Sequence, residues 1–224
     1  MIELEDVRVR FGEREVLRGV SATLAERRIG VVGANGSGKS TLARLFNGLA
    51  LPTSGSVTVL GHDTRRQAAK IRQRVGFLFT DPDAQIVMPT VAEDVAFSLR
   101  RQKLPAEKVK ARVADVLERH GLAGHADHPA HQLSGGQKQL LALCSVLVLE
   151  PEILIMDEPT TLLDLRHSRL VAEHLRTLPQ QLVVVTHDLP LLADFDRVLV
   201  LDEGRVVADA PPDEAIAHYR GLMT

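Results

Sequence analysis

The sequence predicts an α/β fold, because apolar segments of strand length alternate along the chain with segments of helical spacing. Residues 153–156 and 182–185 are continuously apolar, which is typical of parallel strands that are buried on both faces. Residues 29–32 form a third segment of this kind, and they lead through a glycine-rich turn into a helix expected over residues 39–48. These segments predict a mainly parallel sheet as the core of the chain.

Three more segments are predicted as strands. Residues 2–10 alternate apolar and charged side chains, as expected of a strand with one exposed face. Residues 57–60 and 75–79 are short and mostly apolar.

The region from residue 90 to residue 149 contains no predicted strand. Residues 106–120 show the spacing of a helix, carried by Val109, Val113, Val116 and Leu117. The helix is expected to end at Gly121. Because no repeat, low-complexity tract or linker interrupts the chain, we expect one domain over residues 1–224, with a helical subdomain over about 83–149.

The composition excludes several classes of protein. The 224 residues carry a formal net charge of −2 and include no Trp and one Tyr. This balance gives no general attraction to nucleic acid, and it offers few aromatic side chains for stacking on bases. Cys144 is the only cysteine, and its apolar neighbours predict a plain buried thiol in a reducing compartment.

No membrane-spanning segment is expected. The first six residues lack the basic and apolar parts of a signal peptide. The longest apolar run, residues 140–149, is well short of the roughly 20 residues that span a bilayer. Any association with a membrane is therefore expected to need a partner protein.

Residues 33–41 match the phosphate-loop pattern G-x-x-x-x-G-K-[ST]. The glycines let backbone N–H groups point at the phosphates of a nucleotide, Lys39 adds a positive charge, and the Ser40 hydroxyl is suited to Mg²⁺. A chance match in a glycine-rich turn is the alternative, and the preceding strand and following helix argue against it. The residues expected to bind the nucleotide are Gly33, Asn35, Gly36, Ser37, Gly38, Lys39, Ser40 and Thr41.

Two acidic residues follow the strand predicted over 153–156. Asp157 is expected to hold Mg²⁺, directly or through water. Glu158 is expected to act as the general base for the water that attacks the γ-phosphate. Acidic residues at a strand end are often only solvated, but the buried strand before them and Pro159 after them favour the catalytic interpretation.

A second motif lies about a hundred residues after the phosphate loop, at Leu133-Ser134-Gly135-Gly136-Gln137. Ser134 is also a common residue at the N-terminus of a helix, and helix capping is the alternative to a binding role. Together, the two motifs resemble those of the ATP-binding cassette (ABC) ATPases, and the resemblance covers essentially the whole chain. Leu140 departs from it, since many members carry a basic residue there.

The resemblance implies the ABC ATPase form of the P-loop NTPase fold, in which an N-terminal antiparallel β part and a helical subdomain accompany the parallel core. It also implies that two subunits hold ATP between them. In this family the Ser134 to Gln137 segment binds the γ-phosphate of the ATP that is held by the opposite subunit. A helix N-terminus already favours anions, so capping and phosphate binding are compatible.

Other positions extend the resemblance. His187 matches the family's switch histidine, which contacts the γ-phosphate, although a histidine at a strand end can be structural. Asp164 matches an aspartate at the dimer seam, and Leu162 departs from the small residue that is usual nearby. Phe11 stands where the family places an aromatic ring under the adenine, but a single Phe at a strand end is as often part of the core.

A cluster of histidines raises a different possibility. His120, His125, His128 and His131 lie close together in the sequence and could suggest a zinc site. No cysteine accompanies them, and the segment reads as a proline-containing loop, so we favour a solvated connection.

One stretch narrows the resemblance further. Residues 79–85 (Phe-Thr-Asp-Pro-Asp-Ala-Gln) and 90–97 resemble the ATPase subunits of energy-coupling factor transporters, which import vitamins and metal ions in prokaryotes. Thr80 stands where the family's Q-loop glutamine is usual, and Gln85 is expected to serve coupling to a membrane partner more than metal binding. The Pro-Asp-Ala-Gln frame with Thr80 before it resembles the biotin-uptake ATPases of this group.

The resemblance implies an ATP- and Mg²⁺-dependent ATPase that energises a membrane importer. Its implied partners are a second ATPase subunit, identical or paralogous, a transmembrane coupling protein and a substrate-binding membrane protein. The chain would lie peripherally on the cytoplasmic side of the cell (inner) membrane. Its neighbours there, and not this chain, would select the transported solute.

Three alternatives remain open at this point. The first is the ATPase of a conventional importer that is fed by an external binding protein. The second is a soluble ABC ATPase of DNA repair or translation, although such proteins usually carry coiled-coil insertions, tandem cassettes or basic extensions. The third is a simple P-loop kinase, which would leave the Ser134 motif unused.

Overall fold

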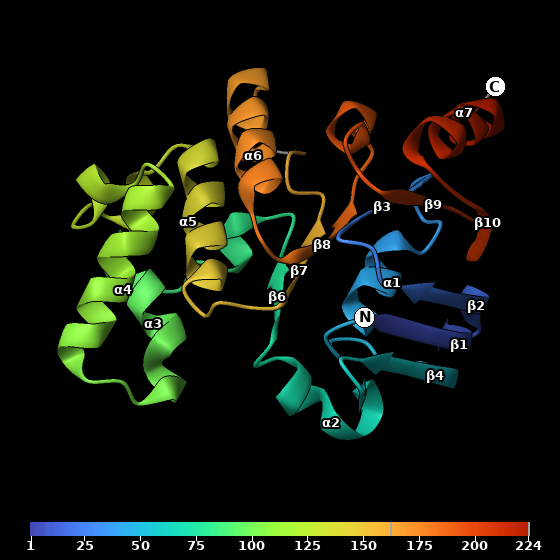
Figure 1. The fold of residues 1–224 in the computed structure, drawn as a ribbon, viewed down its shortest axis with the longest axis horizontal. Helices are drawn as coiled ribbons and strands as arrows, with labels where there is room; N and C mark the ends of the chain where they lie inside the picture. The colour runs from blue at the N-terminus through green and yellow to red at the C-terminus, as the bar shows by residue number, and fades with distance from the viewer. Residues whose placement is uncertain (162, 224) are drawn as a thin grey trace. The chain divides into compact units, whose positions relative to one another are not determined.

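The computed structural model describes residues 1–161 and 163–223, and these residues divide into two compact units. Of these described residues, the first unit comprises 1–75, 152–158 and 180–223, and the second comprises 76–151, 159–161 and 163–179. Figure 1 labels the elements of both. The departure noted at Leu162 lies outside the described residues. A single domain over 1–224 with a helical subdomain over about 83–149 stays a prediction.

The first unit contains the predicted parallel core. Its strands lie in the order β10-β9-β3-β8-β7, and β3 pairs in parallel with β8 and with β9. The bounds are β3 Arg28–Gly33, β7 Ile153–Asp157, β8 Gln181–Val185, β9 Arg197–Asp202 and β10 Arg205–Ala210. Nearly every residue of β3, β7 and β8 is buried, which confirms the prediction made from their apolar runs. Helix α1 (Lys39–Leu45) packs against β7 and β8 and is shorter than expected, since a turn over residues 46–48 replaces its last turn.

The strand register brings the ends of β3, β7 and β8 to one edge of the sheet. Val185 pairs with Val31 of β3 and with Asp157 of β7. The residues that follow these positions therefore leave the sheet side by side. This alignment gathers the phosphate loop, the acidic pair and the segment of His187, which are far apart in the sequence.

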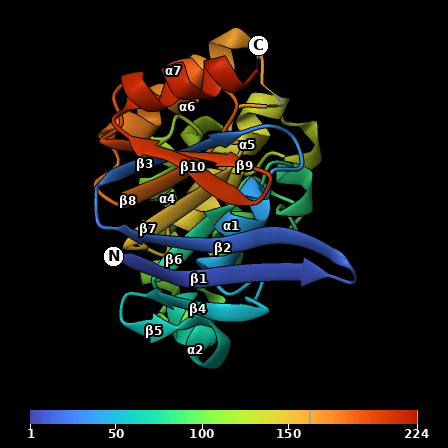
Figure 2. The same ribbon diagram turned by 90° about the vertical axis from the view of Figure 1, so that its right-hand side faces the viewer.

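An antiparallel sheet forms the remaining β structure of the first unit, in the order β2-β1-β4-β5. Its strands are β1 Ile2–Phe11, β2 Arg14–Leu24, β4 Ser54–Val59 and β5 His62–Asp63. Figure 2 shows β1 and β2 as a long hairpin. Gly12 takes a positive φ of 59° in its tight turn, so Phe11 lies at the end of the hairpin. The antiparallel part implied by the family resemblance is confirmed.

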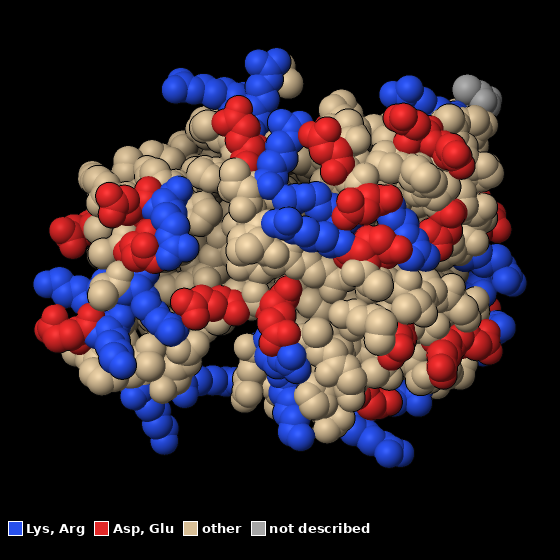
Figure 3. All heavy atoms as spheres, viewed as in Figure 1, with Lys and Arg blue, Asp and Glu red and all other residues tan. Residues whose placement is uncertain are grey.

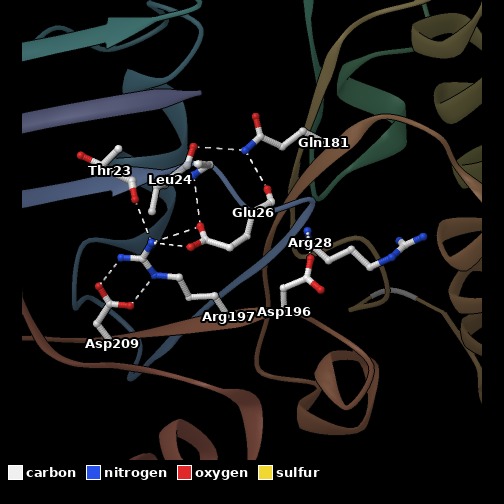
Figure 4. A network of polar contacts seen from close by, with 9 residues as sticks. Thr23, Leu24, Glu26, Arg28, Gln181, Asp196, Arg197 and Asp209 are labelled. Carbon is white, nitrogen blue, oxygen red and sulfur yellow. Dashed lines mark hydrogen bonds and ion pairs between the residues drawn. The ribbon is translucent and has the colours of Figure 1, made fainter.

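An ion-pair network ties the connection between β2 and β3 to the edge of the parallel sheet (Figure 4). Arg197 forms a bidentate pair with Asp209 on the neighbouring strand, at 2.6 Å for each contact. Its Nη1 atom also donates to Glu26 Oε1 at 3.0 Å. These hydrogen bonds and charges raise the pKa of Arg197, so the guanidinium stays charged. Gln181 donates to the main-chain oxygens of Leu24 and Glu26, which fixes the same connection from β8.

Two helices accompany the β structure of the first unit in addition to α1. Helix α2 (Thr64–Ile71) packs on β4 and β5, and helix α7 (Pro212–Leu222) packs on β9 and β10. The Asp63 carboxylate begins α2 by accepting hydrogen bonds from the N–H groups of Arg65 and Arg66.

The second unit is mainly helical, and it also contains most of strand β6 (Val75–Leu78), which confirms the strand predicted over residues 75–79. Its helices are α3 Val91–Ser98, α4 Ala106–Arg119, α5 Gly135–Leu147 and α6 Leu165–Thr177, and α5 packs against the other three. Figure 1 shows α4, α5 and α6 side by side. Among the described residues, the region 90–149 contains no strand, only an isolated bridge between Thr90 and Pro129. Helix α4 ends as predicted, because Gly121 after it takes a φ of 72°.

Cys144 is a buried thiol, as its neighbours predicted. It lies in α5 and is fully buried, with its Sγ atom 3.8 Å from the main-chain oxygen of Val116 in α4. Burial raises the pKa of the thiol to about 12, so the thiolate is not available at neutral pH.

The structure separates the predicted histidine cluster into different environments. The expectation of a solvated connection is wrong for His120, which ends α4, is 8% exposed and packs against His174 of α6 with ring centroids 4.9 Å apart. His125 is partly buried and lies beside His128, while His131 is exposed. Within residues 1–161 and 163–223, no group of three or more His, Cys, Asp or Glu side chains could hold a metal ion.

The buried His120 predicts acid sensitivity of the second unit. Burial, with His174 and Arg119 nearby, lowers the pKa of His120 from 6.5 to about 4. The unfolded chain therefore binds this proton more readily, and the free energy of unfolding is expected to fall between about pH 6.5 and 4, by up to about 3 kcal/mol. In urea unfolding, the midpoint of the second unit should fall less on acidification in His120→Leu than in the unmodified protein. The control His131→Leu, at an exposed position, should be as acid-sensitive as the unmodified protein. If His120→Leu is equally acid-sensitive, His120 is not the source of the effect.

No helix in the described part of the chain is long and apolar enough to cross a membrane. On the face shown in Figure 3, Lys and Arg lie interspersed with Asp and Glu. This mixture fits the small net charge and gives that face no single-sign field of the kind that attracts nucleic acid.

Candidate nucleotide-binding site

The loop between β3 and α1 has the backbone conformation that a phosphate cradle needs. Gly33, Gly36 and Gly38 take positive φ values of 155°, 81° and 105°. A side chain at Gly33 would place Cβ 2.1 Å from the main-chain oxygen of Leu201, and one at Gly38 would place Cβ 2.8 Å from Leu17 Cδ2. Glycine is therefore required at both positions by conformation and by space.

Lys39 is held inside the same loop. Its Nζ atom donates to the main-chain oxygens of Gly33 at 2.7 Å and Ala34 at 2.9 Å, and the residue is 7% exposed. Burial lowers the pKa of Lys39, while the nearby carboxylates of Glu158 and Asp157 oppose that shift. The loop carbonyls and the carboxylates together stabilise the buried ammonium.

Ser40 and Asp157 lie in contact, although 117 residues separate them in the sequence. The Ser40 hydroxyl donates to Asp157 Oδ1 at 2.8 Å, and Asp157 is 2% exposed. Burial raises the pKa of Asp157, and the hydrogen bond from Ser40 and the Arg44 guanidinium, 3.9 Å away, act in the opposite direction. A hydroxyl and a carboxylate that converge in this way are the kind of oxygen donors that Mg²⁺ prefers.

Glu158 and His187 form a pair at the same edge of the sheet. His187 Nδ1 lies 2.8 Å from Glu158 Oε2, and the His187 main-chain N–H donates to the same oxygen at 3.3 Å. The Glu158 side chain is only 15% exposed, and the residue takes a φ of 55°, which is uncommon outside glycine. The carboxylate is thus largely buried and directed at His187, unlike a freely solvated acid at a strand end.

A cavity of about 360 Å³ joins most of these residues. It is lined by Phe11, Arg14, Val16, Asn35, Gly36, Gly38, Lys39, Ser40, Thr41 and Glu158. Phe11 is 59% exposed, so the alternative that it belongs to the core is wrong. Its expected position under an adenine ring stays a prediction.

Arg14 is a member of this cavity that the motifs did not reveal. It begins β2, and its Nη2 atom lies 3.5 Å from the Cβ position of Gly36 in the phosphate loop. A second cation therefore lies beside the loop. No sequence motif indicates that Arg14 lies here, because only the pairing of β1 with β2 brings it beside the phosphate loop.

Ser134 begins helix α5 in the second unit, which confirms the capping interpretation. The Ser134 hydroxyl oxygen accepts from the Gln137 N–H at 3.3 Å, and Gln137 Oε1 accepts from the Ser134 N–H at 2.9 Å. This reciprocal capping box leaves the hydroxyl hydrogen of Ser134 directed elsewhere. Ser134 and Gly135 are both exposed, so the helix N-terminus is accessible to an anion.

Gly136 packs against the start of α6. A side chain at Gly136 would place Cβ 2.1 Å from His167 Cδ2, so glycine is required there. Asp164 caps α6 by accepting from the His167 N–H at 2.8 Å, and its Oδ1 atom lies 2.8 Å from His167 Nδ1. These hydrogen bonds lower the pKa of Asp164. The second unit thus places the two motifs that the resemblance assigns to a dimer seam next to each other.

Gln85 is used inside the second unit. Its Oε1 atom accepts from the Phe79 N–H at 3.2 Å, and its Nε2 atom is 3.4 Å from the Phe77 main-chain oxygen. It also lines a cavity of about 740 Å³. The other residues of that cavity are Val87, Asp94, Phe97, Ser98, Arg100, Arg101, Lys103 and Ser145.

The predicted site residues therefore fall into two groups. Those of the phosphate loop lie in the first unit, where the edge of the parallel sheet brings them together with Asp157, Glu158 and His187, and Phe11 from β1 lines the same cavity as the loop. Those from Ser134 to Gln137 lie in the second unit at the start of α5.

Comparison with known proteins agrees with this geometry. A family model described as ABC transporter matches residues 17–161. A putative ABC transporter ATP-binding protein of Deinococcus radiodurans is 58% identical over 100% of this chain and 99% of its own length. The biotin transport ATP-binding protein BioM of Rhizobium etli is 49% identical over 99% of this chain and 98% of its own.

A solved structure extends the agreement to the fold. The structure of cbiO1 from Clostridium perfringens, part of the ABC transporter complex cbiONQ, matches with a TM-score of 0.85 and 33% identity over 99% of this chain and 92% of that one. The α/β architecture with its antiparallel part is therefore that of ABC ATPases. The phosphate loop, the Ser134 motif and these likenesses lead to one conclusion: the chain belongs to the ABC transporter family, as an ATP-binding protein that couples ATP hydrolysis to transport.

Proposed function

We propose that this chain is the ATP-hydrolysing subunit of a prokaryotic importer of the energy-coupling factor type, which takes up a vitamin such as biotin or a metal ion. The convergence of the phosphate loop, the Ser40–Asp157 contact and the Glu158–His187 pair at one sheet edge carries the ATPase part of the proposal. The full-length likeness to a biotin transport ATP-binding protein supports the importer type.

Within one subunit the first unit binds the nucleotide. Backbone N–H groups of the loop and the Lys39 ammonium bind the phosphates, Phe11 stacks on the adenine, and Arg14 adds a second positive charge. Ser40 and Asp157 would hold Mg²⁺, and the bound ion would neutralise part of the phosphate charge. The two side chains suit this ion, because Ser40 Oγ and Asp157 Oδ1 are oxygen ligands that lie 2.8 Å apart.

The hydrolytic step is assigned to the acidic residue after β7. Glu158 accepts the proton of the attacking water, and His187 orients the carboxylate and contacts the γ-phosphate. The buried position of Glu158 keeps competing solvent from its carboxylate.

Two subunits are needed for the complete site. In the proposed dimer, identical or paralogous, Ser134 to Gln137 of one subunit bind the γ-phosphate held by the other. ATP then favours the closed dimer through contacts that exist only in that state, and hydrolysis releases it. The whole chain acts as one domain over 1–224, and the helical subdomain over about 83–149 carries the Ser134 motif.

The second unit is the proposed docking region for the membrane partners, a transmembrane coupling protein and a substrate-binding membrane protein. Its cavity of about 740 Å³ presents the exposed apolar side chains of Val87 and Phe97 beside the cations of Arg100, Arg101 and Lys103. An amphipathic cytoplasmic helix with acidic residues would satisfy both features. The chain would then be peripheral, on the cytoplasmic side of the cell (inner) membrane.

Gln85 and Thr80 are expected to differ in their effects. Gln85→Ala removes the contacts of a cavity-lining amide, so solute uptake should fall several-fold while ATP affinity stays within about twofold. Thr80 has a shorter side chain than glutamine, and Thr80→Ala should lower hydrolysis only a few-fold. ATPase rate and uptake measured on the same reconstituted complexes would test both, with exposed Gln132→Ala as the control. A hundredfold loss of hydrolysis in Thr80→Ala would contradict the assignment.

The proposal as a whole is tested by its partners. The tagged chain, purified with mild detergent from its native membrane, is expected to bring with it a transmembrane coupling protein and a small substrate-binding membrane protein. Reconstitution of these components should give ATP-dependent uptake without any external binding protein. Co-purification with a conventional permease that needs such a binding protein would reject the energy-coupling type.

A further inference from the structure

His125 contacts the Ser134 motif from the connection that precedes α5. It closes a short 3₁₀ turn, Ala123–His125, in the second unit. Its Nε2 atom lies 3.0 Å from Nε2 of Gln137, the last residue of the motif. His125 is therefore the histidine of the predicted cluster that reaches the candidate binding site.

The chemistry of Gln137 determines the direction of this hydrogen bond. The Oε1 atom of Gln137 accepts from the Ser134 N–H at 2.9 Å, so the other end of the amide is the NH₂ group. That group must donate to His125 Nε2, which must be unprotonated. In the neutral ring the hydrogen is then on Nδ1.

The surroundings of His125 hold the ring in place. The Nδ1 atom is buried and has no hydrogen-bond partner within the described part of the chain. His128 packs on the ring, with centroids 5.0 Å apart. Because one ring nitrogen is enclosed and the other meets Gln137, rotation of the ring would forfeit the hydrogen bond with Gln137.

We infer that His125 is a positioning residue for the Ser134 motif, and this inference rests on the proposed role of that motif in binding the opposite subunit's ATP. His125 holds the Gln137 amide in the orientation in which Oε1 caps Ser134. The Ser134 backbone N–H is satisfied in this way, and the hydroxyl keeps its hydrogen for a phosphate. Loss of the His125 acceptor frees the Gln137 amide to turn and to compete for that hydroxyl.

Substitutions of different chemistry separate this role from packing. Glutamine at position 125 can place a carbonyl oxygen near the position of Nε2, whereas leucine keeps an apolar volume without an acceptor. In the Glu158→Gln background, His125→Leu is expected to raise the ATP concentration that gives half-maximal dimerisation by about three- to tenfold. His125→Gln should bring this concentration most of the way back to that of the background protein. ATP affinity of the monomer, measured at low protein concentration, should change by less than about twofold, because the phosphate loop lies in the first unit.

Controls make each outcome decisive. His131→Leu, an exposed histidine of the same connection, should dimerise as the background protein does. Normal closure of His125→Leu, or equal impairment of the leucine and glutamine variants, would overturn the inference. Ser134→Arg tests the proposed function separately. If the Ser134 motif does not bind the opposite subunit's ATP, Ser134→Arg will also dimerise normally on ATP.

The tautomer of His125 can be measured in the unmodified protein, so this test does not depend on whether a variant folds. Nitrogen-15 NMR of the histidine rings is expected to show His125 with Nε2 unprotonated and Nδ1 protonated. A proton on Nε2 would overturn the inference whatever the variants do, because the Gln137 amide could not then donate to it.

Discussion

Replacing Glu158 by glutamine is expected to reduce steady-state ATP hydrolysis by about 10²- to 10⁴-fold while ATP still binds. The Glu158 carboxylate is largely buried and lies 2.8 Å from His187 Nδ1, at the edge that also carries the phosphate loop. Glutamine keeps the size and can keep a hydrogen bond to His187, but it cannot accept a proton from water. Phosphate release by the complex with its membrane partners, together with ATP binding to the isolated chain, would measure both effects.

The same substitution is expected to trap the closed dimer. Because hydrolysis is the step that removes the γ-phosphate, the variant should accumulate as an ATP-bound dimer in sedimentation experiments. Glu203→Gln is a suitable control, since this exposed carboxylate forms a surface ion pair with Arg18 at 3.7 Å. Near-normal hydrolysis by Glu158→Gln would remove Glu158 from the role of base.

Replacing Ser134 by arginine is expected to abolish ATP-driven dimerisation in the Glu158→Gln background, with little change in ATP binding by the monomer. Ser134 is exposed at the N-terminus of α5, and a long cation there would fill the position of the opposite γ-phosphate. The capping hydrogen bond from the Gln137 N–H would also be lost. Sedimentation with and without ATP, with nucleotide binding measured in parallel, would test this expectation.

Two comparisons separate closure from nucleotide binding. Lys39→Ala should weaken ATP binding itself, because it removes the charge held inside the phosphate loop. Gln132→Arg introduces the same cation at an exposed position two residues before Ser134 and should still dimerise. If Ser134→Arg closes on ATP as readily as the background protein, the cross-subunit role of the motif is wrong.

Much of the fold follows from local patterns. The apolar runs at 153–156 and 182–185 predicted buried strands, and the structure has β7 and β8 there. Strand β10 was not predicted, because its residues alternate between exposed and half-buried and it becomes a strand only by pairing with β9. Helix α6 was missed as well, although Asp164 at its start is a typical capping residue.

The identities of the site residues could be read from the sequence, since the phosphate loop and the Ser134 motif are contiguous and have strict chemistry. Their geometry could not, because the pairings join distant positions. Ser40 meets Asp157 across 117 residues, and Glu158 meets His187, only because parallel strands align their ends at one edge. Arg14 beside the loop and His125 beside Gln137 carry no motif at all, and folding alone places them there. Residue type and local order were thus determined by the sequence, and the side-chain contacts on which catalysis depends were decided by long-range strand pairing and helix packing.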